Sequence, residues 1–136
     1  METIAIAHAV ATLAMFGLIW FVQVVHYPLF SSVDGDFAVY AKLHSRRTSR
    51  VVGPLMIVEA VTATALMADD PSWVSVTGVA LVAVAWASTA FVQVPCHRRL
   101  SQGFDTAAHR QLVRSNWLRT ITSSVRAGIA VALLPE

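Results

Sequence analysis

Two segments of the chain place a glutamine and a histidine in the same apolar context. The four letters FVQV occur twice, with Gln23 in one copy and Gln93 in the other, and a histidine, His26 or His97, follows each copy closely. Imidazole titrates near neutral pH, so each histidine is a candidate catalytic proton-transfer group. The glutamine amides are candidate substrate-binding groups because they donate and accept hydrogen bonds. We expect the two copies to belong to two repeated helical hairpins.

A third polar group lies near the C-terminus. Asn116, Arg119, Ser123 and Arg126 recur at intervals of three and four residues, which places them on one face of a helix. A guanidinium beside an amide can hold a carbonyl oxygen or an oxyanion. Asn116 and Arg119 are therefore candidate substrate-binding residues.

Glu59 and Arg126 are predicted to form a structural ion pair. Each lies about nine residues from the end of an apolar stretch, or about 13 Å at 1.5 Å per residue, near the middle of a membrane. A guanidinium cannot lose its proton there, so it needs a partner. His44 and Thr48 fall within about 60° of Glu59 around a helix axis, at 100° per residue.

The histidines also allow two cofactor hypotheses. His26 and His97 could be axial ligands of a haem between helices, and with His44 and His109 they could form a non-haem metal site. A carboxylate-rich di-iron site needs several glutamates within the bundle, where the sequence offers only Glu59. We assign no metal ligands from the sequence, and the cofactor stays unknown.

The composition indicates that lipid surrounds the elements that carry these residues. Hydrophobic residues make up 56% of the 136 residues and charged residues 13%, against roughly 25% charged in soluble domains. A membrane span needs about 20 apolar residues. We predict an all-α fold, a single integral membrane domain over residues 1–136 with four transmembrane helices in an up-down-up-down bundle. The expected spans are 4–25, 51–68, 73–94 and 117–134.

The boundaries of these spans carry turn and capping signals. Pro54 is expected in the first turn of the second span, where proline is tolerated. Asp36 and Asp105 follow the first and third spans and can cap the helices that come next. The pattern of residues 37–50 and 106–116 has no helix breaker, so we expect both helices to extend beyond the membrane.

Basic residues predict the orientation. Nine of the 10 lysines and arginines lie in or beside the two connections after the first and third spans. The positive-inside rule places these connections in the cytoplasm and both termini outside, in a bacterial inner membrane. This rule already explains the basic residues, so no nucleic-acid partner is expected. The start of the chain has no basic residue before its apolar run, so we expect the first segment to be retained rather than cleaved.

Two functions fit the polar residues in the spans. One is an enzyme or binder for a small lipophilic molecule, quinone-like or polycyclic, with a pocket in the cytoplasmic half of the bundle. The alternative is a non-enzymatic accessory subunit whose polar residues specify helix packing, at about 0.6 kcal/mol per interhelical hydrogen bond. A cavity among these side chains favours the first. The expected partners are membrane lipids, a lipophilic small molecule and, in a homodimer, a second copy of the chain.

Two short segments resemble a known family. The letters His26-Tyr27-Pro28 end the first span, and residues 115–120, SNWLRT, begin the fourth. In these letters and in its four-span length, the chain resembles a group of small bacterial membrane proteins and is distantly similar to the anthrone-oxygenase-like membrane domain. The resemblance implies an oxygenase-related activity on a polycyclic or quinone-like substrate without an obvious cofactor. It implies site roles for Asn116, Trp117 and Arg119.

Overall fold

The computed structural model describes residues 1–134, and this part of the chain contains helices and no strand. It forms four helical segments. The first consists of α1 (Glu2–Phe21), the π-helix η1 (Val22–His26) and the 3-10 helix η2 (Pro28–Ser32), and the second is α2 (Phe37–Asp69). The third consists of α3 (Trp73–Ser88), the π-helix η3 (Thr89–Gln93) and α4 (Val94–Leu100), and the fourth is α5 (Thr106–Ala132). The predicted all-α fold is confirmed.

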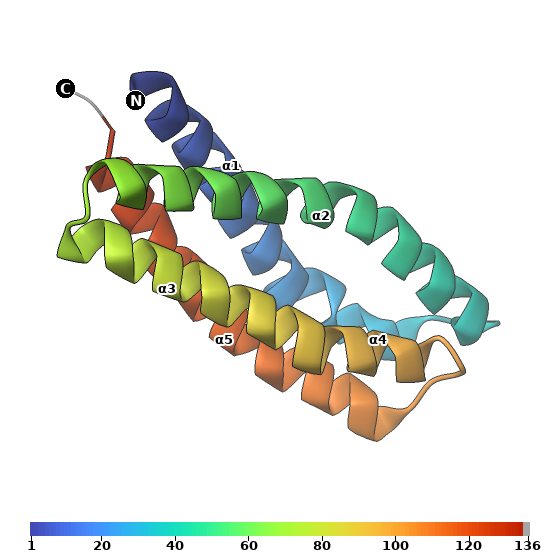
Figure 1. The fold of residues 1–136 in the computed structure, drawn as a ribbon. Helices are drawn as coiled ribbons and strands as arrows, with labels where there is room; N and C mark the ends of the chain where they lie inside the picture. The colour runs from blue at the N-terminus through green and yellow to red at the C-terminus, as the bar shows by residue number, and fades with distance from the viewer. Residues whose placement is uncertain (135–136) are drawn as a thin grey trace.

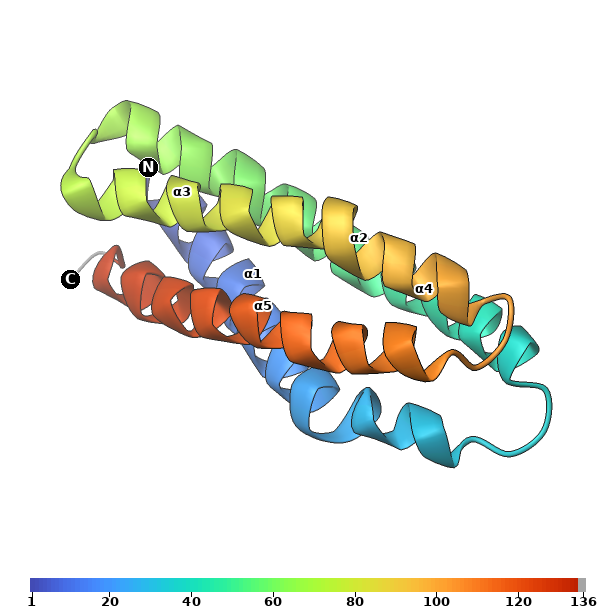
Figure 2. The same cartoon turned by 90° about the horizontal axis from the view of Figure 1, so that it is seen from below.

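Consecutive segments run in opposite directions and form a bundle (Figures 1 and 2). α1 contacts α2 and α5, and α3 contacts the same two helices, so the four segments surround a shared interior. The N-terminus, the end of α5 and the α2–α3 connection lie at one end of the bundle (Figure 1). The other end carries residues 26–50 and 95–115 and is called the basic end below, after its lysines and arginines.

Three of the segments are long and apolar enough to cross a membrane: Glu2–Ser32, Phe37–Asp69 and Trp73–Leu100. Large apolar side chains lie on the outside, where Trp73 is 87% and Phe91 80% exposed. Such an exposed apolar surface is unfavourable in water, so the chain is a membrane protein. α5 carries two buried arginines, Arg119 and Arg126, and its role as a fourth span stays a prediction.

Two predicted caps are present. The carboxylate of Asp36 accepts a hydrogen bond from the backbone N–H of Val39 at 3.2 Å, at the start of α2. Asp105 accepts one from Ala108 at 2.9 Å, at the start of α5. This bond, with a second one from Arg99, lowers the pKa of the Asp105 carboxyl below its ordinary value. Both caps belong to connections at the basic end and so fix where the two helices begin.

The position of Pro54 differs from the prediction that it lies near a helix start. α2 has 33 residues, so Pro54 lies well inside it and removes one backbone hydrogen bond there. At 1.5 Å per residue the helix is about 50 Å long, against about 30 Å of hydrocarbon. α2 therefore extends beyond the membrane, as expected from residues 37–50.

Both copies of FVQV coincide with π-helical turns. Gln23 and His26 lie in η1, and Gln93 lies in η3 of the third segment. Gln23 and Gln93 are 3% and 2% exposed. π-Helical turns inside helices are rare and frequently occur at functional sites. The two-hairpin repeat itself stays a prediction.

Candidate functional site

A pocket of about 660 Å³ lies between α2 and the third segment, toward the basic end. Apolar side chains from α1, α2 and α3 form much of its wall, among them Ile19, Met56, Ile57 and Trp86. Ligand sites for small molecules typically occupy about 300–1,000 Å³ and have mostly apolar linings with a few polar groups. The pocket has the size and lining of such a site.

Five polar side chains from all four segments line the inner part of the pocket. Tyr27 comes from the first segment, His44 from α2, Gln93 and His97 from the third segment and Arg119 from α5. The Tyr27 hydroxyl and Nε2 of His97 are hydrogen-bonded at 3.0 Å. The rings of His44 and His97 lie with centroids 5.3 Å apart. Groups that can donate, accept and transfer protons thus meet beside an apolar volume.

His44 is at the centre of a histidine cluster. Its Nδ1 lies 2.9 Å from Nε2 of His26 and 3.2 Å from the Thr48 hydroxyl. If Nδ1 accepts both hydrogen bonds, Nε2 of His44 carries the proton. That Nε2 is buried and has no hydrogen-bond partner within residues 1–134. In that tautomer the N–H group at Nε2 of His44 can donate to a bound molecule.

Phe30 packs against the histidine cluster. Its ring is 1% exposed and packs edge-on against His44, with centroids 5.0 Å apart. Pro28 starts the 3-10 helix that carries Phe30 into this position. On the other side Nε2 of His109 donates a hydrogen bond to the backbone carbonyl of Tyr27 at 2.8 Å. The chain after the first span thus folds back against the site rather than extending away from it.

Gln23 and Asn116 make interhelical contacts. Asn116 donates to Oε1 of Gln23 at 3.0 Å, and Nε2 of Gln23 donates to the carbonyl of Val113 at 3.2 Å. Both side chains are buried, and neither lines the pocket. Their contacts match the packing alternative. Gln93 differs, because its amide donates to Ser115 at 2.8 Å while its Oε1 is buried without a partner within residues 1–134.

Trp117 lies on the outer surface, 44% exposed, with its ring edge-on to Trp20 at 5.9 Å. It sits on the opposite side of α5 from Arg119, because residues two apart on a helix do not share a face. The structure thus separates the predicted site residues into two sets. His97, Gln93 and Arg119 line the pocket, whereas His26, Gln23, Asn116 and Trp117 do not.

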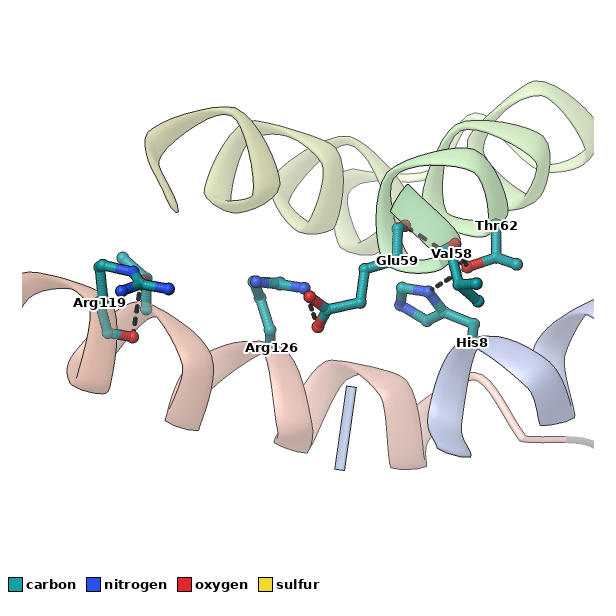
Figure 3. Close-up of polar contacts among 7 residues, drawn as sticks. His8, Val58, Glu59, Thr62, Arg119 and Arg126 are labelled. Atoms are coloured by element: carbon teal, nitrogen blue, oxygen red, sulfur yellow. Dashed lines mark hydrogen bonds and ion pairs between the residues drawn. The ribbon is translucent and has the colours of Figure 1, made fainter. Parts of the chain in front are cut away.

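The predicted Glu59–Arg126 ion pair is present in the interior (Figure 3). The side chains are 2% and 4% exposed. His8 lies beside Glu59 and is hydrogen-bonded to Thr62 at 2.9 Å. The pair joins α2 to α5 on the side of the pocket away from the basic end, with Arg119 two turns along α5.

Sequence reasoning did not select Tyr27 as a site residue, and it considered His44 only as a ligand of a possible metal site. His44 falls on the polar face of helix two, and Tyr27 follows His26 directly, but neither belongs to the repeated pattern. The four-histidine metal site has no geometric support, since within residues 1–134 no group of three or more His, Cys, Asp or Glu side chains is placed to hold a metal ion.

Comparisons with family models, with curated proteins and with solved structures gave no match. The similarity to the anthrone-oxygenase-like domain therefore stays a prediction. The fold and the pocket together define the class: a helical membrane protein with a largely apolar pocket between its helices.

Proposed function

We propose that the protein binds a small lipophilic molecule inside the bundle. In the enzymatic form of the proposal, it also transforms this molecule. The pocket of about 660 Å³ carries this proposal, because it combines apolar walls with inward polar groups from four segments. A protein whose polar residues served packing alone would fill this space with side chains. The molecule is quinone-like or polycyclic in this proposal, and it enters from the lipid between α2 and the third segment.

The pocket residues have distinct roles in the proposal. His97, hydrogen-bonded to the Tyr27 hydroxyl, is the proton-transfer group. The Arg119 guanidinium stabilises negative charge on an oxygen of the bound molecule. His26 acts through His44, to which it is hydrogen-bonded, and Asn116 acts through Arg119.

The accessory-subunit alternative is supported by a different observation. Gln23, Asn116 and Thr120 hydrogen-bond across helices and are removed from the pocket. A homodimer fits either function. The orientation belongs to the proposal as well: the basic end faces the cytoplasm of a bacterial cell, and both termini face outward.

Filling the pocket tests the proposal. A Cβ at Gly53, which lines the pocket, would meet no atom within 4 Å, so Gly53→Leu adds volume without an initial clash. Gly17 on α1 is equally open but does not line the pocket, and Gly17→Leu is the matched control. We expect a naphthoquinone to quench the tryptophan fluorescence, to which Trp86 in the pocket wall contributes, in the wild type and in Gly17→Leu, with at least tenfold weaker binding in Gly53→Leu. Equal binding by all three would contradict the proposal.

A further inference from the structure

The charged residues around the pocket indicate which chemical class of molecule it binds. We infer that the pocket takes a lipophilic monoanion, with an apolar body against the walls and a carboxylate paired with Arg119. This inference rests on the proposed function, because it concerns the molecule bound in the same pocket.

Arg119 is a buried cation without a carboxylate partner in the described part of the chain. It is 7% exposed, and it lines the pocket. Residues 1–134 contain two ion pairs, Arg99–Asp105 and Arg126–Glu59, and neither includes it. Its side-chain partners are neutral: Oδ1 of Asn116 at 3.4 Å, at the long limit for such a bond, and the Tyr27 hydroxyl. Figure 3 shows Arg119 extending from α5 apart from the Glu59–Arg126 pair.

An unpaired guanidinium in a bundle interior is unfavourable. It keeps its proton at any physiological pH, so the charge cannot be removed by titration. Removing a charge from water without a partner costs more free energy than one neutral hydrogen bond returns. Glu59 already pairs with Arg126, whose own positive charge lies on the same helix as Arg119. An anion from outside the chain is therefore the partner that the site lacks.

The other residues that line the pocket also favour an anion. Its lining contains three further basic residues, Lys42, Arg46 and Arg98, and no aspartate or glutamate. In the tautomer that carries its proton on Nε2, His44 supplies a further donor in the lining, because this atom is buried without a partner in residues 1–134. Of the two buried guanidinium groups, that of Arg126 is already paired with Glu59, so one negative charge balances that of Arg119. A carboxylate fits best, because the planar guanidinium can bind both of its oxygens.

Three probes that share one chain and differ in the head group test this inference. Oleate, oleyl alcohol and oleyl phosphate are titrated into the detergent-purified protein, and binding is followed by tryptophan fluorescence. We expect oleate to bind at least tenfold more tightly than oleyl alcohol. Arg119→Gln removes this preference, and Arg119→Lys retains part of it because the charge remains. Arg114 is exposed on the same helix, and Arg114→Gln is the control that leaves the preference unchanged.

The outcomes separate the inference from the proposed function. Equal binding of oleate and oleyl alcohol, both weakened by Gly53→Leu, overturns the anion and leaves the lipophile pocket standing. Tighter binding of oleyl phosphate than of oleate overturns the carboxylate. If none of the three probes nor the naphthoquinone binds, the proposed function fails with the inference. The wild-type comparison needs no substitution, so it decides the question even where an Arg119 variant does not fold.

Discussion

Several residues in the interior of this bundle are held by charge and hydrogen bonding in addition to apolar contact. The Glu59–Arg126 pair is the clearest case, since both side chains are almost fully buried. Such a pair is weak grounds for net stability, because burying both ions costs about as much as their attraction returns. Its effect is to fix how α2 and α5 face each other, which in turn sets the position of Arg119.

Replacing one residue of the Glu59–Arg126 pair should reduce the free energy of unfolding more than replacing both residues does. Glu59→Gln or Arg126→Gln leaves one uncompensated buried group, and we expect a loss of about 3–5 kcal/mol in the free energy of unfolding. The double variant should lose clearly less than the sum of the single losses. Unfolding in detergent measures all three. Additive losses would mean that the two residues do not interact.

Tyr27→Phe tests the hydrogen bond to His97. The substitution keeps the ring and removes the hydroxyl that lies 3.0 Å from Nε2 of His97. We expect a loss of about 1 kcal/mol in unfolding free energy, typical of one hydrogen bond, and weaker naphthoquinone binding. Tyr40 has no side-chain hydrogen bond among residues 1–134, and Tyr40→Phe is the control. Equal effects of the two substitutions would remove Tyr27 from the site.

Residue patterns in the sequence predicted some of these contacts and missed others. The depth of Glu59 and Arg126 within their spans was sufficient to predict that they pair, because few charged residues occur in the spans. Helical spacing selected Arg119, whereas Trp117 was included only through the family resemblance and points outward. Tyr27 was missed because its contact with His97 depends on how the chain folds back after η1. That path is a tertiary property with no local pattern.

At the scale of elements, connections at the basic end determine where helices start. The caps at Asp36 and Asp105 were predictable because a short acidic residue after a turn has a well-defined role. The π-helical turns were not predictable, since Val22–His26 and Thr89–Gln93 have the composition of ordinary apolar helix. The length of α2 was partly predictable, and the interior place of Pro54 was not.

The cap of α2 can be removed without touching the pocket. Asp36→Ala deletes the hydrogen bond to the Val39 N–H, and we expect a loss of about 1 kcal/mol in unfolding free energy. Asp34→Ala changes the same charge in the same connection, and no hydrogen bond of the Asp34 side chain occurs among residues 1–134, so it serves as the control. A loss equal in both variants would show that charge in this connection, rather than the cap, is responsible.

The whole molecule has an apolar exterior, and its interior combines two apolar clusters with buried polar and charged side chains. Its three long apolar segments require a membrane. Its basic residues are concentrated at one end, so the proposed orientation places that end in the cytoplasm. A phosphatase fused to the C-terminus should then be active outside, and a fluorescent protein fused there should be dark. The opposite pattern would contradict the outward placement of the termini.

Native mass spectrometry of the protein released from mild detergent tests the central claim most directly. The account predicts that the wild type and Gly17→Leu carry one small lipophilic molecule per chain. Gly53→Leu should lose this added mass, because the new side chain occupies the pocket. A bare chain in every variant, or the same bound mass in Gly53→Leu as in the wild type, would contradict a ligand site inside the bundle.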